Sequence, residues 1–142
     1  NGGSFADAQH LTAEFISKLR FDRNPLPAIA LGTNSSNLTA IGNDYGFEYI
    51  FERELIALHG ENDIFIPIST SGNSKNIIRA INKAKQLGII TYGLTGINGG
   101  KMNGLCNVIK VPSNKTEKIQ ECHILIGHII CSLIESEIFK KK

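Results

Sequence analysis

Several features that would assign a chain to a specialised class are scarce or missing here. The three cysteines are odd in number and have no CxxC spacing, so we expect reduced thiols in a cytoplasmic protein. No apolar run approaches the ~20 residues of a membrane span, and no signal peptide opens the chain. No basic stripe interleaved with aromatic residues is present. We therefore expect neither a membrane nor a nucleic acid as partner.

The remaining composition is that of an ordinary globular protein. Hydrophobic residues make up 42% of the chain and charged residues 20%. A length of 142 residues suffices for a real core, and repeats, low-complexity tracts and linkers are absent. We therefore expect one domain over residues 1–142. The net charge of +2 includes the tail Lys140–Lys142, which is most simply a solvated chain end.

Apolar periodicity predicts a regular alternation of helices and strands. Helices are expected over 5–19, near 38, and over 47–58, 73–87 and 116–139, and strands over 28–31, 64–68, 89–94 and 108–111. This alternation is typical of an α/β fold in which helices cover both faces of a parallel sheet. The last helix is apolar around most of its circumference, so one face can cover the sheet and the other needs a partner. We therefore expect an oligomer.

A polar loop after the strand expected over 64–68 is the strongest candidate for a binding site. Its hydroxyl side chains belong to Ser69, Thr70, Ser71 and Ser74. Gly72 lets the backbone approach a ligand closely, and the N-terminus of the following helix favours a phosphate. A simple Ser-rich helix cap is the alternative interpretation. The loop lacks a closing Gly-Lys-Ser/Thr and has one glycine instead of three, so we expect a small phosphorylated metabolite and no nucleotide cofactor.

Two helices carry groups suited to acid–base chemistry or to metal binding. His10 and Glu14, at i and i+4, share one helix face. Gln120 and His128 are separated by about 80° around the axis of the last helix, so we expect them to converge too. Two imidazoles, a carboxylate and an amide oxygen suit a divalent metal such as zinc. The same groups could instead transfer protons, or could be a surface pair and a structural core histidine.

Six motifs spread along the chain carry a family resemblance. They are Asn1-Gly-Gly-Ser4, Ala8-Gln-His10 with Glu14, Gly42-Asn43-Asp44, Ser69-Thr-Ser-Gly-Asn-Ser74, Thr95-Gly-x-x-Gly-Gly-Lys101-Met102, and Ile119-Gln120-Glu121 with His128. Together they resemble the phosphoheptose isomerase (sedoheptulose 7-phosphate isomerase) family of the SIS domain superfamily. The similarity runs from the first residue to the last helix. The Ser/Thr loop alone identifies only the superfamily, whereas its combination with the polar helical residues is specific.

The resemblance implies a three-layer α/β/α sandwich of the flavodoxin-like SIS type. The family has a strand and a helical segment before the Asn-Gly-Gly-Ser motif, so we expect these to be missing from this chain. The implied reaction converts sedoheptulose 7-phosphate to D-glycero-D-manno-heptose 7-phosphate, on the way to heptose for lipopolysaccharide or capsule. The resemblance also implies a homotetramer with active sites between subunits, and one zinc ion per site as in some members.

Matching the family's motifs residue by residue assigns roles to positions in this chain. The substrate's phosphate and hydroxyls would be bound by Asn1, Gly2, Gly3, Ser4, Asn43, Asp44, Ser69, Thr70, Ser71, Ser74 and Gln120. The zinc ligands would be His10, Glu14, Gln120 and His128. Glu14 would transfer the carbon-bound proton and His128 the proton on the oxygen side. Glu117-Lys118 departs from the acidic residue and Arg that some members carry there, so neither residue receives a role.

The competing hypothesis is a non-catalytic SIS module that binds a protein partner, similar to certain replication-initiation regulators. Those relatives lack counterparts of Glu14 and His128, and both residues are present here, which favours the enzyme. A third possibility is a domain that senses a sugar phosphate for a regulator. It would be accompanied by a DNA-binding segment, and none is visible in the sequence.

Overall fold

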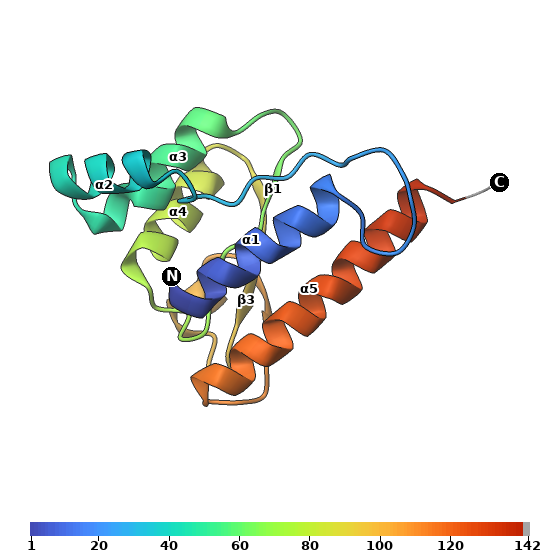
Figure 1. Cartoon of the computed structure of the whole chain (residues 1–142). Coiled ribbons are helices and arrows are strands. Elements are labelled where there is room, and N and C mark those ends of the chain that lie inside the picture. Colours follow the sequence, from blue (N-terminus) through green and yellow to red (C-terminus); the bar gives the residue numbers. More distant parts are fainter. Residues whose placement is uncertain (141–142) are drawn as a thin grey trace.

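The computed structural model describes residues 1–140, in which helices and strands alternate along the chain (Figure 1). The helices are α1 (Gly2–Ile16), α2 (Ser35–Asp44), α3 (Ile50–Leu58), α4 (Lys75–Gln86) and α5 (Thr116–Ile138), with short 3-10 turns η1 (Phe47–Tyr49) and η2 (Gly100–Gly104). The strands are β1 (Ile64–Phe65), β2 (Ile68–Ser69), β3 (Ile90–Thr95) and β4 (Asn107–Lys110). Of the predicted solvated tail, residues 141 and 142 lie outside the described residues.

The sheet is parallel throughout and centred on β3. Strand β4 pairs with one edge of β3, and β1 and β2 pair with β3 in a single continuous register, with Ile64 opposite Ile90 and Ile68 opposite Leu94. The two short strands are therefore halves of the one strand predicted over 64–68. The ladder breaks next to Pro67, which has no N–H to donate.

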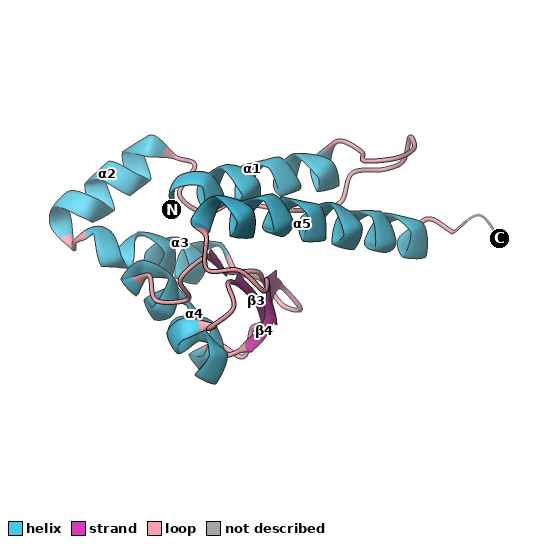
Figure 2. Cartoon of the chain, turned by 90° about the horizontal axis from the view of Figure 1, so that it is seen from below, coloured by secondary structure: helices cyan, strands magenta, loops and turns pink. Residues whose placement is uncertain are grey.

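The helices form two layers around the sheet, as predicted from the alternation of elements. Figure 2 shows α1 and α5 side by side on one side of the strands, with α3 and α4 on the other. The main core cluster lies on the α3–α4 side and consists of Ile50, Phe51, Ile77, Ala80, Ile81 and Met102. Within residues 1–140, no helix combines the length and the hydropathy needed to cross a bilayer.

Two local predictions differ from the structure. The segment 28–31 forms no strand, because a strand needs a neighbour to exchange backbone hydrogen bonds and none lies beside it among the described residues. The motif Gly42–Asp44, predicted as a turn, is the last turn of α2. Helix α2 is longer than predicted and starts at a cap in which Asn34 Oδ1 accepts the Asn37 N–H at 3.1 Å.

Helices α1 and α5 form a close parallel pair, the feature of the fold that matters most for the site. Gly3 lies against Gln120 and Leu11 against Gly127, while near the end of α5 Glu135 accepts the Leu19 N–H. These contacts keep nearly the same spacing in sequence, so the helices run side by side in the same direction. Gly127 permits the closeness because it has no side chain.

The outer face of α5 carries an apolar stripe in the single chain. Its residues, spaced four apart, are Leu125, Ile129 and Leu133, which are 58%, 50% and 65% exposed. The predicted two-sided apolar character of this helix is therefore present in the structure. The oligomer inferred from it stays a prediction.

Candidate active site

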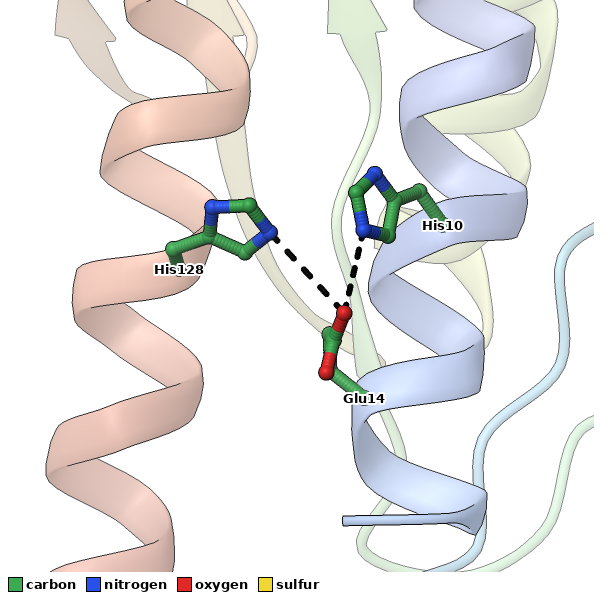
Figure 3. A group of neighbouring side chains, drawn as sticks. All are labelled: His10, Glu14 and His128. Atoms are coloured by element: carbon green, nitrogen blue, oxygen red, sulfur yellow. Dashed lines mark ion pairs between the residues drawn. The ribbon is translucent and has the colours of Figure 1, made fainter. Parts of the chain in front are cut away.

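Three predicted site residues meet across the α1–α5 pair (Figure 3). Glu14 Oε1 lies 3.0 Å from His10 Nε2 and 4.0 Å from His128 Nε2. The His10 and His128 rings contact edge to face, with centroids 4.9 Å apart. The Glu14 side chain is 17% exposed and that of His10 52%, so the carboxylate is shielded while the group stays open to a ligand. We call His10, Glu14 and His128 the helix-pair triad.

The helix-pair triad has the donor set and dimensions of a metal site. One ligand atom from each residue lies within 4.8 Å of the others. A tetrahedral zinc ion with bonds of ~2 Å places its ligands about 3.3 Å apart, so small side-chain movements would close the group around an ion. Two imidazoles and a carboxylate with a free fourth position are the ligand set of several catalytic zinc sites. The three residues therefore fit zinc.

Gln120 lies away from the helix-pair triad in the single chain. Its side-chain amide packs against Gly3, where an added Cβ would lie 2.6 Å from it. Eight residues of α-helix advance about 12 Å along the axis, so Gln120 and His128 are more than two turns apart although they face similar directions. The predicted convergence considered rotation around the helix and neglected this rise.

The first motif residues form the start of α1 and tie it to α4. Asn1 Nδ2 donates to Asn76 Oδ1 at 3.0 Å, and Asn76 Nδ2 donates back to Asn1 Oδ1 at 2.8 Å. Asn76 is 3% exposed. Gly2 and Gly3 occupy the first turn, and Ser4 is buried. The sequence analysis missed Asn76, whose only signal was a polar side chain on the apolar face of its helix.

The Ser/Thr loop, residues 69–74, leads into α4 as predicted. The Ser69 and Ser74 hydroxyls are 3.1 Å apart, and the Ser74 side chain makes no capping bond to α4. The Ile77 N–H bonds to Asn76 Oδ1 at 3.0 Å, which leaves the Lys75 and Asn76 N–H groups at the start of this 12-residue helix without a side-chain cap and suits a phosphate. The loop is braced by the neighbouring turn, because Asn73 Oδ1 accepts the Lys101 N–H at 3.0 Å.

The loop lies between two open cavities. The larger, about 490 Å³, is lined by Asn1, Tyr45, Gly46, Phe47, Glu48, Ser74, Lys75 and Asn76. The smaller, about 280 Å³, is lined by Thr70, Ser71, Asn73, Gly96, Ile97, Asn98, Gly99, Ser113, Asn114, Thr116 and Ile119. Neither of these two cavities is lined by the helix-pair triad, so the hydroxyl loop and the triad open to solvent separately in the single chain.

Asn43 and Asp44 lie apart from the other predicted site residues. They are exposed on the last turn of α2, at the edge of the molecule (Figure 1), where Asn43 Nδ2 donates to Asp44 Oδ1 at 2.8 Å. The structure therefore does not bring them to the helix-pair triad. The next residues, Tyr45 and Gly46, line the larger cavity.

Helix α5 also carries a buried polar residue, His123, next to Asp7 of α1 and Thr95 of β3. His123 is fully buried, and neither ring nitrogen has a hydrogen-bond partner among the described residues. Burial lowers the pKa of His123, against the opposing effects of the Thr95 backbone and the Asp7 carboxylate. Burial likewise raises the pKa of Asp7, with His123 and His10 opposing it. No spacing pattern separates His123 from the apolar residues around it.

Several known proteins are similar to this chain along almost its whole length. Residues 1–96 match the SIS domain family. The phosphoheptose isomerase of Aneurinibacillus thermoaerophilus is 60% identical over all of this chain and 72% of its own length. Phosphoheptose isomerase 2 of Campylobacter jejuni is 58% identical over 99% of this chain and 71% of its own length.

Solved structures give the same result for the fold. The phosphoheptose isomerase of Francisella tularensis superposes with a TM-score of 0.91 at 41% identity, covering 96% of this chain and 73% of that one. The enzyme from Neisseria gonorrhoeae gives 0.89 at 44% identity, with the same coverage. These similarities cover the α1–α5 pair and the Ser/Thr loop together. The chain belongs to the phosphoheptose isomerase family of SIS-domain proteins.

Proposed function

We propose that this chain converts sedoheptulose 7-phosphate to D-glycero-D-manno-heptose 7-phosphate, a ketose–aldose isomerisation. The observation that carries the proposal is the Glu14 carboxylate between His10 and His128, in a chain 60% identical to a phosphoheptose isomerase. The reaction moves a proton between C1 and C2 through an enediol. It needs a base near the carbons and an acid–base group near the two oxygens, and the helix-pair triad offers both.

In the proposed mechanism Glu14 removes a proton from C1 of the ketose and returns it to C2. His128 moves a proton between the C1 and C2 oxygens, so that the carbonyl passes from C2 to C1. The proposal is supported by the 4.0 Å distance between the His128 ring nitrogen and the Glu14 oxygen, which lets both groups reach one C1–C2 unit. The Glu14 side chain is only 17% exposed, and this shielding would limit competition from water.

We assign the substrate's phosphate to the Ser/Thr loop, with Ser69, Thr70, Ser71 and Ser74 as hydroxyl donors and the start of α4 as dipole. The support is the first turn of α4, where Ser74 makes no capping bond and the Lys75 and Asn76 N–H groups have no side-chain acceptor. Residues 1–4 would bind the sugar from the same side, because Asn1 and Ser74 line one cavity. We also propose that Asn43 and Asp44 contact the sugar. They lie next to Tyr45, which lines the same cavity as Asn1 and Ser74.

We propose zinc as a resident ion, one per site, held by His10, Glu14 and His128. When bound, it would stabilise negative charge on the substrate oxygens. A carboxylate bound to the ion is a poorer base, so the two roles of Glu14 compete. Gln120 is too far along α5 to share the ion with His128 of the same chain, so we assign it to the site of a neighbouring copy. This arrangement agrees with a homotetramer whose sites lie between subunits.

The remaining assignments follow from the family. We propose that residues 1–142 form one SIS domain, that the protein works in the cytoplasm without a nucleotide cofactor, and that its product supplies heptose for lipopolysaccharide or capsule. The regulator hypothesis predicts an intact fold without turnover. It is therefore an outcome of the test below.

The test is isomerase activity on sedoheptulose 7-phosphate before and after chelation, with zinc added back. We expect activity to fall on chelation and to return with zinc. Glu14→Gln and His128→Asn should each lower kcat by ~10² or more, the usual range for lost acid–base groups, without changing the oligomer. His59→Asn is the control, because His59 is exposed at the end of α3. Near-normal rates in either site variant would sink the mechanism, and no turnover at all would favour the regulator.

A further inference from the structure

A buried ion pair joins the loop after α1 to the far end of α5. Arg23 Nε lies 2.8 Å from Glu135 Oε1, and the two side chains are 2% and 1% exposed. Both residues lie outside the helix-pair triad and outside the Ser/Thr loop. A buried arginine and glutamate require a full set of hydrogen bonds, so their other partners indicate what the pair holds in place.

The guanidinium group binds the backbone that carries Glu14. Arg23 Nη2 donates to the Glu14 carbonyl at 2.7 Å, and Nη1 donates to the Phe15 carbonyl at 2.7 Å. These carbonyls belong to the last turn of α1, where helical partners run out. The two Nη groups of Arg23 therefore bind the backbone of α1 at Glu14, the proposed base, and at the next residue.

The Glu135 carboxylate binds the backbone of the segment that follows α1. Glu135 Oε1 accepts the Leu19 N–H at 3.1 Å and Oε2 accepts the Arg20 N–H at 3.0 Å. Glu135 follows His128 by seven residues, which is two helical turns, so both lie on nearly the same face of α5. Both carboxylate oxygens of Glu135 are thus used to hold the chain that follows α1.

We infer that Arg23 and Glu135 are positioning residues that set the height of Glu14 against His128 along the α1–α5 pair. This inference rests on the proposed function, because it concerns the geometry of the same triad. A slip of one residue along a helix displaces a side chain by about 1.5 Å. Catalytic and metal sites tolerate about 0.5 Å. We call the Arg23–Glu135 pair the clip; it fixes the register by directional hydrogen bonds, which the apolar contact of Leu11 with Gly127 does not provide.

The chemistry of the clip favours positioning over stability. A buried ion pair often contributes little net stability compared with apolar residues of the same volume. Its directional hydrogen bonds nevertheless select one register of the two helices. In the observed register Arg23 bonds both to the Glu14 carbonyl and to the Glu135 carboxylate.

The test uses two conservative variants and two controls. Arg23→Lys keeps the charge and loses the fork, while Glu135→Gln keeps the shape and loses the charge. Glu52→Gln breaks a second Arg–Glu pair, in which Arg79 Nε lies 2.8 Å from Glu52 Oε2 between α4 and α3. Ile81→Val, in the core on that side, supplies a loss of stability without any change near the triad.

Zinc affinity is measured by competition with a chromophoric chelator, and kcat and KM on sedoheptulose 7-phosphate are measured separately. We expect Arg23→Lys and Glu135→Gln to weaken zinc binding by ~10–100-fold, as lost outer contacts of metal ligands do. In the same variants kcat should fall while KM changes little. Both controls should match the wild type in all three quantities.

Each outcome is decisive. Unchanged zinc affinity and kcat in both variants, or equal losses in Ile81→Val, would overturn the positioning role. So would a failure of both variants to fold, because the pair would then be a stability element. If the wild type binds zinc without turnover, the proposed function is refuted. The zinc affinities of the variants then still test the positioning role. If the wild type turns over substrate without binding zinc, the kcat values of the variants test the positioning role instead.

Discussion

The side chain of Leu11 occupies the space that a side chain at position 127 would fill, and residue 127 is a glycine. A Cβ on Gly127 would lie 2.5 Å from both Leu11 methyl carbons, so alanine can enter only if the Leu11 side chain or the helices shift. The separation matters because His10 and His128 face each other across the same pair. A single missing side chain thus sets the width of the candidate site.

Gly127→Ala should therefore destabilise the fold, although alanine is the better helix former by about 0.5–1 kcal/mol. We expect a net loss of ~1–3 kcal/mol in the free energy of unfolding, typical of overpacking, and weaker zinc binding. Urea denaturation and chelator competition measure the two effects. Adding Leu11→Ala should restore part of the zinc affinity by making room. A Gly127→Ala protein more stable than the wild type would contradict the close packing.

The burial of His123 predicts how the free energy of unfolding depends on pH. Burial holds its pKa below the ordinary ~6.5, so the unfolded chain takes up a proton on acidification before the folded chain does. Stability from this group is complete above pH ~6.5 and falls as the pH drops below that value. In His123→Gln the decline in unfolding free energy between about pH 7 and 5 should be shallower, because one titrating group is gone.

The other histidines are present in both proteins, so the comparison isolates His123 with its neighbour Asp7. Chemical denaturation at several pH values gives the two slopes. Equal slopes for wild type and variant would mean that His123 is as easily protonated in the fold as in the unfolded chain.

Spacing within one helix predicted some site residues and could not predict others. The i, i+4 pattern identified His10 and Glu14, and their meeting with His128 was anticipated. Asn76 bonds to a residue 75 positions away, and Arg23 to one 112 positions away. A local pattern contains no information about such partners. Their roles emerge only when the fold brings distant segments together.

Among the elements, the Ser/Thr loop and the 96–100 turn act as one unit. Gly72 has φ +65°, and a Cβ there would lie 2.0 Å from the Gly99 carbonyl oxygen. The two backbones therefore touch directly, which fixes the loop at the start of α4. The sequence predicted that glycine would permit a close approach and took the partner to be a ligand. In the structure the partner is the neighbouring turn.

Gly72→Ala should cost about 2 kcal/mol or more, from the left-handed backbone and the clash together. It should also weaken binding of inorganic phosphate, measured by calorimetry. Gly42→Ala is the matched control, because φ is not positive there and nothing lies within 4 Å of the added Cβ. The control lies in a helix and should gain stability by ~0.5–1 kcal/mol. Equal effects of the two changes would refute the bracing.

Element boundaries show where periodicity stops being informative. It located the five helices, because each has an apolar face against the sheet or a neighbouring helix. It could not show that Pro67 divides a strand, or that 28–31 lacks a pairing partner, since hydrogen bonding between strands is not encoded in the pattern of one strand. It also ended α2 early, because Gly42 suggested a turn.

On the scale of the whole molecule, the outer stripe of α5 leaves the single chain with an uncovered apolar surface. Leu125 and Leu133 are more than half exposed on the helix that carries His128. Leu125→Glu with Leu133→Glu should therefore shift the protein from the proposed tetramer to smaller species, measured by light scattering. Activity should fall with the tetramer, since the sites are proposed to lie between subunits.

Leu58→Glu is the control for that double change, because Leu58 is 50% exposed at the end of α3. It should leave the mass and the rate unchanged. An unaltered mass in the double variant would mean that this stripe is not the subunit contact. A loss of mass in the control would point to general effects of added charge.

The parallel pairing of the first and last helices also sets the order of events on the ribosome. Leu19 and Glu135 are 116 residues apart in sequence, and a similar length of chain separates Glu14 from His128. The first residue of each pair is therefore synthesised well before its partner. At the usual pace of translation that interval lasts roughly 6–23 s, during which α3 and α4 can already fold. The triad is therefore completed only when α5 emerges. A nascent chain stalled before α5 should be inert, because His10 and Glu14 of α1 still lack their partner His128.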